Sequence, residues 1–229
     1  MSVAENLSAE QARERDTAIM GPTLGPLYHA LADEVAWLQV KWSQYRQLYA
    51  HSLHRVELLN KAGGQFFLVV QVVLWEDVLL GMARLTDSPG SGKKARLTLR
   101  TLARAIPDAE LSKEVAKLSA AAEAPFVRDY RDRWLAHSDL GVALERDVKP
   151  LPEISRQNVE KALTAIRAVL NRIEVHYYGS PTSYEDTIAG LGEAEAVVMH
   201  LRTGLRAERA RFERLKQGRA AARGPRKRA

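Results

Sequence analysis

An arginine and a histidine lie six residues apart in the segment Arg131-Asp-Arg-Trp-Leu-Ala-His137-Ser-Asp139, and this pair has the chemistry needed to cleave RNA. Histidine titrates near neutral pH, so it can take the proton from a ribose 2′-hydroxyl or give one to the leaving 5′-oxygen. Arginine cannot lose its charge, and its planar fork matches the negative charge that builds on a phosphate in the transition state. No metal is required, because the attacking 2′-oxygen is already part of the substrate. This segment is therefore the first candidate for chemistry in the chain.

The spacing of the pair limits how it can act. Successive residues of an α-helix are rotated by about 100°, so Arg131 and His137 point roughly 120° apart on an unbroken helix. They converge only if the helix loosens between them, or if two copies of the chain each supply a part. Arg133 and His137, four residues apart, do share a helix face. Arg128 adds another arginine beside large aromatic residues, a composition enriched at protein interfaces. We therefore expect a homodimer.

His137 also has a purely structural interpretation. The aromatic side chains of the segment recur at steps of four: Phe126, Tyr130 and Trp134. His137 continues their stripe, and a histidine in such a stripe is commonly a core residue with a satisfied hydrogen bond. Asp139 favours the functional interpretation, because a nearby carboxylate can orient or charge an imidazole. Both interpretations remain open at this point.

Other patterns in the chain indicate no site. Arg46 and His51 form a second arginine–histidine pair, which we attribute to chance. The stretch Gly90-Ser-Gly-Lys-Lys94 resembles a phosphate-binding loop, but Asp87 occupies the position of the first glycine and no strand precedes it. We therefore interpret it as a surface loop. His51 and His54 have no carboxylate at a suitable spacing to complete a metal site, so we expect no metal and no cofactor.

The elements that must position these residues are predicted to be helices. Apolar residues recur at steps of three and four from Leu24 to Leu59, and Gly63-Gly64 should end that helix. The stretch from Phe66 to Leu85 is apolar on most faces, which predicts the central and most buried helix. Further helices are expected over residues 97–102, 108–122, 126–138, 155–173 and 184–215. No repeat and no convincing strand is present, so the pattern predicts an all-α helical bundle.

Composition narrows the class of protein. The chain has 229 residues, of which 46% are hydrophobic, enough for one sizeable core. It contains no cysteine, which excludes disulfides, thiolate zinc sites and thiol nucleophiles. The polar N-terminus does not have the pattern of a signal peptide, and charged residues interrupt the apolar stretch 66–85. We expect a cytoplasmic protein that does not span a membrane.

Charge divides the chain into a body and a tail. Residues 201–229 contain 11 Lys and Arg against 2 Asp and Glu, so the formal charge of +6 originates there and the remainder is mildly acidic. A basic tail can bind nucleic acid by releasing counter-ions, or it can simply keep the protein soluble. We expect a polar arm over residues 1–22, one helical domain over 23–216 and a disordered basic tail over 217–229.

The candidate segment resembles the signature of HEPN domains. The run from Tyr130 to Asp139 is most similar to the abortive-infection U-type branch, in which an Arg-Asp-basic core leads into Ala-His-x-Asp. Two stretches of the apolar helix, Trp75-Glu-Asp77 and Arg84-Leu-Thr-Asp87, also fit that branch, as does the Gly-Lys-rich loop before Leu97-Thr-Leu99. The resemblance covers roughly residues 25–205. Arg84 and Asp87 are either an i,i+3 ion pair or part of a cleft beside the motif.

The resemblance implies an up-and-down HEPN bundle with a long central apolar helix that dimerises with its motifs facing each other. It also implies a metal-independent endoribonuclease of phage defence or of a toxin–antitoxin pair, which cleaves RNA by 2′-hydroxyl transesterification. Arg131 and His137 would be the catalytic pair. The residues expected to assist are Asp132, Arg133 and Asp139, and those expected in the cleft are Arg84, Asp87, Arg128 and Tyr130.

Two alternatives remain beside an RNase. The first is a non-catalytic dimeric module that binds RNA or a protein partner through the same surface, since some HEPN proteins bind without cutting. The second is a purely structural bundle with His137 in its core. The expected partners are RNA, a second copy of the chain, and an antitoxin or defence protein.

Overall fold

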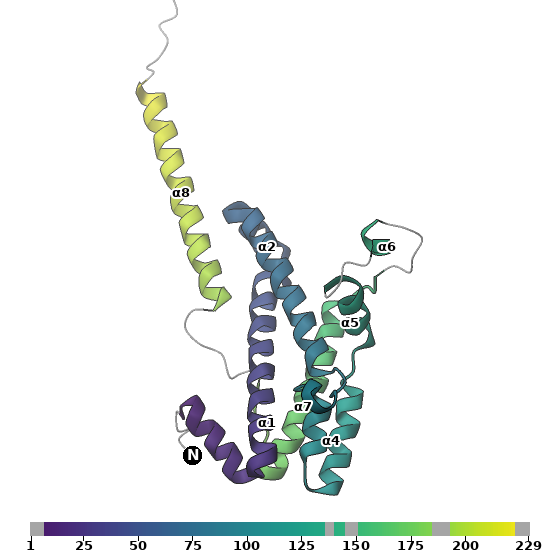
Figure 1. Cartoon of the computed structure of the whole chain (residues 1–229). Coiled ribbons are helices and arrows are strands. Elements are labelled where there is room, and N and C mark those ends of the chain that lie inside the picture. Colours follow the sequence, from purple (N-terminus) through teal and green to yellow (C-terminus); the bar gives the residue numbers. More distant parts are fainter. Residues whose placement is uncertain (1–6, 136–139, 145–150, 185–192, 223–229) are drawn as a thin grey trace, which may run out of the picture. The chain divides into compact units, whose positions relative to one another are not determined.

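The structure, a computed structural model, describes residues 7–135, 140–144, 151–184 and 193–222. Within these ranges every regular element is a helix and no strand is present, which confirms the predicted all-α fold (Figure 1). The α-helices are α1 (Ala9–Tyr45), α2 (Leu53–Leu85), α3 (Leu99–Ala105), α4 (Ala109–Ala121), α5 (Pro125–Tyr130), α6 (Leu140–Ala143), α7 (Arg156–Tyr178) and α8 (Ala194–Ala222). Two π-helical segments, η1 (Arg46–Ala50) and η3 (Arg131–Leu135), and one 3₁₀ turn, η2 (Gly92–Lys94), complete the set.

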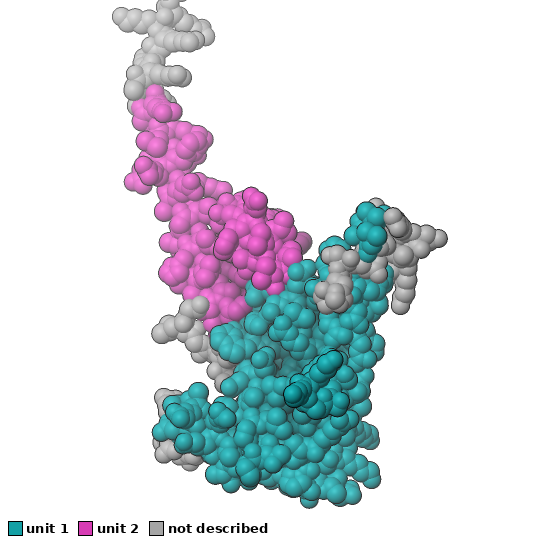
Figure 2. Space-filling model, viewed as in Figure 1, with its two compact units in different colours: residues 1–42, 74–188 teal, residues 43–73, 189–229 magenta. Residues whose placement is uncertain are grey.

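The chain divides into two compact units (Figure 2). The first unit comprises Met1–Trp42 and Leu74–Ile188, and the second comprises Ser43–Val73 and Ala189–Ala229. The helices α1 and α2 each contribute residues to both units. We describe each unit by itself.

Helix α7 supplies an apolar stripe to the core of the first unit. Its fully buried side chains follow steps of four and three: Val159, Leu163, Ile166, Leu170 and Ile173. The Ser155 hydroxyl accepts a hydrogen bond from the Asn158 N–H at 3.1 Å and caps the first turn. Gly179, in the left-handed region with φ of 76°, ends the helix. The apolar periodicity predicted this helix over residues 155–173, and in the structure it continues to Tyr178.

The N-terminal segment is more ordered than the sequence indicated. Residues 9–22, expected as part of a weakly ordered arm, form the beginning of α1, which bends at Gly21 (φ 87°). Asp16 fixes this part of the helix, because its side chain is almost fully buried and accepts a hydrogen bond from the Tyr178 hydroxyl at 2.5 Å. His29 Nδ1 lies 3.0 Å from the other Asp16 oxygen. A buried carboxylate with partners on two helices explains why a polar segment is held in place.

The apolar helix α2 is not the most buried helix, and that expectation is wrong. Burial is confined largely to its C-terminal part, where Val78, Leu79 and Met82 are inaccessible to solvent. In the preceding turns, large apolar side chains are 45–66% exposed: Phe66, Leu68, Val69, Val72 and Val73. By length and composition alone, α2 is the one helix of the described residues that could cross a membrane, although core helices of soluble proteins meet the same criterion. When apolar residues occur on every face of a helix, the sequence predicts the helix but does not indicate which of its faces pack against neighbouring elements.

The second unit is held together at the beginning of α8. Arg55, which is buried, donates to both carboxylate oxygens of Glu195 at 2.5 and 3.0 Å. The side-chain oxygens of Gln44 and Gln47 accept the backbone N–H groups of Ala194 and Glu195. These bonds satisfy donors that an α-helix leaves unpaired in its first turn, and they fix α8 against the end of α1, η1 and the beginning of α2.

Helix α8 continues through Ala222, into the segment 217–229 that was expected to be disordered. Alanine, arginine, lysine and glutamine have high helix propensity, so a charged stretch without an apolar face can extend an established helix. The remaining tail, residues 223–229, lies outside the described residues.

Candidate functional site

The candidate motif begins where an α-helix widens into a π-helix. Helix α5 starts with Pro125 in its first turn and ends at Tyr130, and η3 then carries Arg131 to Leu135 with wider i→i+5 turns. Such a segment advances by less than the α-helical 100° per residue, so the directions of its side chains differ from those on an ideal helix. The helix is therefore wider than an α-helix from residue 131 to 135. His137 and Asp139 lie outside the described residues.

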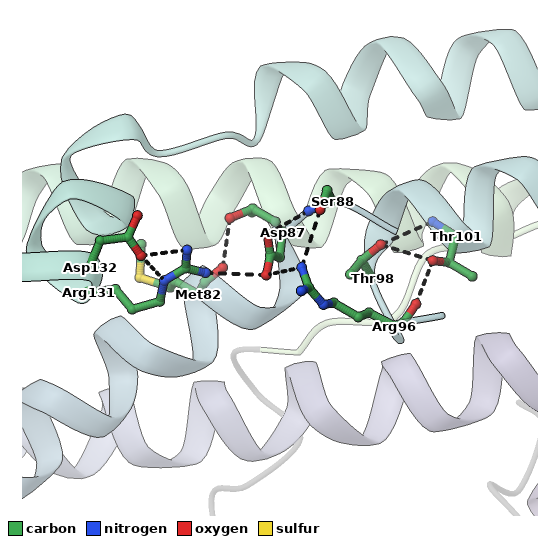
Figure 3. A network of polar contacts seen from close by, with 9 residues as sticks. Met82, Asp87, Ser88, Arg96, Thr98, Thr101, Arg131 and Asp132 are labelled. Carbon is green, nitrogen blue, oxygen red and sulfur yellow. Dashed lines mark hydrogen bonds and ion pairs between the residues drawn. The ribbon is translucent and has the colours of Figure 1, made fainter. Parts of the chain in front are cut away.

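Arg131 is held between two carboxylates in the first unit (Figure 3). Its Nη1 lies 3.3 Å from Oδ2 of Asp87, at the C-terminal end of α2. Its Nε and Nη2 both lie 2.7 Å from Oδ1 of Asp132, the next residue in the chain. The Arg131 side chain is 20% exposed and Asp132 is mostly exposed, so one edge of the guanidinium meets the protein interior and the other meets solvent. A guanidinium fixed in this way has little freedom left to lose when it binds an anion.

Asp87 joins two arginines that are far apart in the sequence. The same Oδ2 that meets Arg131 accepts a hydrogen bond from Arg96 Nη1 at 2.9 Å, and Oδ1 accepts the backbone N–H of Ser88 at 2.7 Å (Figure 3). Only one carboxylate therefore separates two permanent positive charges. Sequence reasoning missed Arg96, because no local spacing relates it to Arg131. We call Arg131, Asp132, Asp87 and Arg96 the Arg131 network.

The loop that resembles a phosphate-binding loop positions Arg96. Gly90 has a φ of 67°, and a Cβ there would lie 2.1 Å from the Lys94 carbonyl oxygen, so only glycine fits this tight turn. The Arg96 N–H donates to the Pro89 carbonyl at 2.8 Å, and the Thr101 hydroxyl donates to the Arg96 carbonyl at 2.6 Å. The backbone of Arg96 is thus fixed from both sides, and its side chain reaches Asp87.

A surface pocket of about 500 Å³ opens beside the Arg131 network. Its lining includes Asp87 and Arg96 of the network and also Arg84, from the last turn of α2. Among the described residues no ion pair joins Arg84 to Asp87, so of the two interpretations of this pair the geometry favours the cleft. Leu85, Leu97 and Glu34 form the rest of the lining. The pocket is wide enough for a nucleotide-sized ligand and presents two guanidinium groups.

The aromatic stripe of the motif lies at the surface of the first unit. Phe126 and Tyr130 are half-buried and Trp134 is 40% exposed, whereas the buried residue of α5 is Val127. The Trp134 indole N–H points to Glu76 Oε1 at 3.4 Å. Burial, together with the charge of Glu76, raises the pKa of the Tyr130 hydroxyl. The stripe that suggested a core position for His137 is therefore not itself in the core.

The other arginines of the motif have partners on or near α5. Arg133 lies 3.5 Å from the Asp129 carboxylate one turn earlier, and Arg128 lies 3.5 Å from Glu123. The structure thus brings Arg131, Asp132 and Asp87 together, and it directs Arg128 and Arg133 to different carboxylates.

The histidines of the second unit form no metal site. His51 and His54 are exposed, and among the described residues no group of three or more metal-ligating side chains is present.

Comparison with known protein families identifies a match over most of the chain. The model of the HEPN family described as AbiU2 matches residues 22–196, which is more than half of the chain. No curated protein and no solved structure matches.

Proposed function

The chain belongs to the AbiU2 family of HEPN proteins, and from this membership we propose that it is a metal-independent endoribonuclease that acts in defence against phage. The observation that supports this function most directly is the Arg131 guanidinium, held by Asp87 and Asp132 at the solvent boundary beside a pocket that carries Arg84 and Arg96. A fixed guanidinium at the edge of a pocket that contains two further arginines suits a phosphodiester that gains negative charge during reaction, although Glu34 and Asp87 balance the charge of the pocket itself.

In the proposed reaction His137 takes the proton from a ribose 2′-hydroxyl. The 2′-oxygen then forms a bond to phosphorus, the bond from phosphorus to the 5′-oxygen breaks, and that oxygen takes up a proton. Arg131 binds the non-bridging oxygens, whose charge is greatest in the pentacoordinate transition state. The products are a 2′,3′-cyclic phosphate and a 5′-hydroxyl, and DNA is resistant because it lacks the internal nucleophile.

Asp87 positions Arg131 in this proposal. Because one oxygen of Asp87 contacts both Arg131 and Arg96, the carboxylate fixes the two guanidinium groups relative to each other and offsets their repulsion. Asp132 is more exposed, and a phosphate can replace it on the outer edge of Arg131. Arg133 and Asp139 remain candidates for assistance.

We further propose that two copies of the chain form a homodimer in the cytoplasm and that their motifs together make one cleft. The support is the exposed Trp134 beside Arg128 and Arg131, since aromatic side chains and arginine are enriched at interfaces. An antitoxin or another defence protein is the expected regulator of an RNase that acts on cellular RNA.

A second candidate function is binding without cleavage. Its support is that two carboxylates already contact Arg131, which is also the arrangement of a structural ion-pair network. In that case the pocket beside Asp87 holds RNA or a protein partner, and no bond is broken.

The deciding experiment is incubation of the purified protein with cellular RNA, with and without EDTA. We expect cleavage that EDTA does not affect, and products with a 2′,3′-cyclic phosphate. His137→Ala should lower the rate on the order of 10²–10⁴-fold, the usual contribution of a general acid or base. Arg131→Lys should also be impaired, because an ammonium keeps the charge but not the fork.

The chain supplies its own control for this experiment. His51 belongs to the second arginine–histidine pair and is exposed in the second unit, so His51→Ala should leave cleavage unchanged. Equal rates in wild type and His137→Ala would contradict the proposal. Retained RNA binding without cleavage in any variant would favour the binding module.

A further inference from the structure

The second unit contains a groove with basic walls. It has a volume of about 490 Å³ and lies between the beginning of α2 and the middle of α8. Its permanently charged lining residues are Lys61 from α2 and Arg202, Arg206 and Arg209 from α8. His54 adds a fifth basic side chain, and Leu58 and Leu205, both half-buried, form the apolar floor.

The spacing of these residues places their charges in rows. Arg202, Arg206 and Arg209 follow steps of four and three, so they lie within roughly 60° of one another around α8 and at intervals of about 4.5–6 Å along its axis. His54 and Lys61 are seven residues apart and share one face of α2 in the same way. Each helix therefore presents a basic row with a leucine between its members.

The charges of the groove have few partners of their own. No carboxylate lines it, and among the described residues Lys61, Arg206 and Arg209 form no ion pair within 4.0 Å. His54 lies 4.0 Å from Glu57, and the charge of Arg202 contributes, after the hydrogen bond from Arg55, to lowering the pKa of Glu195. Elsewhere in this unit Arg55 is buried and pairs with both carboxylate oxygens of Glu195. Like charges collected without counter-charges repel one another until an anion binds between them.

We propose that this groove binds the sugar-phosphate backbone of single-stranded RNA. Guanidinium groups at regular intervals along one wall match a chain of phosphates, for which arginine has the bidentate fork. The two leucines offer an apolar floor to sugars and bases, which an acidic peptide would not need. Beyond the groove Glu213 interrupts the basic row and pairs with Lys216 at 3.4 Å, but the segment after α8 contains four more Lys and Arg, which a long polyanion can contact.

The choice of RNA as the ligand rests on the proposed endoribonuclease function, but binding in the groove is separable from cleavage. The catalytic pair is in the motif at residues 131–137, whereas the groove belongs to residues 54–61 and 202–209. A protein that loses groove binding therefore keeps its catalytic groups, and a protein without catalytic groups keeps its groove.

The test measures binding of a fluorescent single-stranded RNA to the full-length His137→Ala protein at several salt concentrations. In this background, Arg206→Gln/Arg209→Gln should weaken binding at least tenfold. It should also reduce the slope of log K against log salt by about 1.4, the value for two phosphate contacts on a single strand. The matched control is Arg211→Gln/Arg214→Gln, which removes the same charge from positions roughly 80–160° away from Arg206 and Arg209 around α8.

The outcomes separate this proposal from the proposed function. A loss confined to the groove variant supports the groove, and circular dichroism confirms that both variants remain helical. An equal loss in the two variants, unchanged binding in both, or capture of a polyglutamate peptide in preference to RNA would each overturn it. If the wild type cleaves no RNA yet the groove variant alone loses RNA binding, the endoribonuclease proposal fails and the groove stands.

Discussion

At the scale of single residues, the informative finding is that Asp87 connects Arg131 to Arg96. The sequence identified Arg131 from its chemistry and offered Asp87 as a cleft residue, but it could not relate either to Arg96. Their contacts join positions 44 and 9 residues apart, which no helical periodicity encodes. Local spacing predicts which residues share one helix face, and the packing of helix ends decides which side chains from different elements meet.

If Asp87 positions Arg131, Asp87→Asn should reduce kcat by on the order of 10–100-fold and change KM little, because a small displacement of a catalytic group is costly. Asp87→Glu should restore part of the rate by keeping the charge. Glu114→Gln is the control, since it removes a carboxylate that pairs with Arg172, outside the motif. A uniform rise of KM in Asp87→Asn, with kcat unchanged, would assign Asp87 to substrate binding rather than to positioning.

Tyr49 gives a prediction about alkaline pH. Its hydroxyl donates to the Phe67 carbonyl at 2.7 Å, and burial, with a smaller contribution from Tyr45, raises its pKa to about 12. The unfolded chain loses this proton near pH 10, before the folded protein does. The contribution of Tyr49 to stability is therefore complete below pH 10 and is lost as the pH rises through about 12.

Denaturant titrations of wild type and Tyr49→Phe at several alkaline pH values test this. The wild type should lose more stability than Tyr49→Phe between pH 10 and 12, whatever the other tyrosines contribute to both. Parallel pH profiles for the two proteins would mean that the hydroxyl is solvated in the folded state.

At the scale of elements, the sequence predicted the buried face of α7, which has one apolar stripe, better than that of α2, which is apolar on most faces. The apolar stripe of α7 specified its approximate position and its buried face. In α2 the apolar residues surround the helix, so the sequence could not indicate that most of the large apolar side chains from Phe66 to Val73 would be exposed. The apolar periodicity also could not predict that η3 is π-helical. A π-helix differs from an α-helix in its backbone hydrogen bonds, and the pattern of apolar residues does not report them.

Substitution of Gly25 tests how tightly the two segments of α1 pack against each other. A Cβ on Gly25 would lie 2.5 Å from Thr17 Cα and 2.6 Å from the Asp16 carbonyl oxygen, both of which are backbone atoms. Gly25→Ala must therefore displace the preceding helical segment and should destabilise the protein by about 1–3 kcal/mol. Gly204→Ala, with no atom within 4 Å of its new methyl, should instead stabilise α8 by about 0.5–1 kcal/mol. Thermal unfolding of both variants checks the opposite signs, and a neutral Gly25→Ala would show that the two segments of α1 separate easily.

At the scale of the whole molecule, the family and the fold class could be predicted from the sequence, but the two compact units could not. The motif and the apolar helix carried the resemblance that the family match bears out. The expected boundaries described one helical domain between two tails, because composition changes only at the ends of the chain. The units instead divide within helices, where composition gives no signal.

If the motifs of two copies of the chain form one cleft, two different inactive variants should complement each other. Arg131→Ala and His137→Ala should each be inactive alone, yet a mixture of the two should regain part of the wild-type rate. One mixed dimer keeps an intact arginine from one copy and an intact histidine from the other. Light scattering should show a dimer for the wild type and for both variants. An inactive mixture of dimers would place both catalytic groups in one copy, and a fully active monomer would refute the dimer.

The division of α1 between Trp42 and Ser43, and of α2 between Val73 and Leu74, has a consequence for how the protein folds. Domains usually meet in loops, and each must then start its own helices from a disordered chain. The first turn of a helix is unfavourable, because it orders several residues for a single hydrogen bond. Each residue added later forms one hydrogen bond, so its free-energy cost is much smaller. If the first unit folds first, the ends of α1 and α2 that leave it are turns already formed, so these two helices need no new nucleus in the second unit. Helix α8 lies wholly in the second unit and must form its own first turn, so the order of folding decides how many helices the second unit has to nucleate.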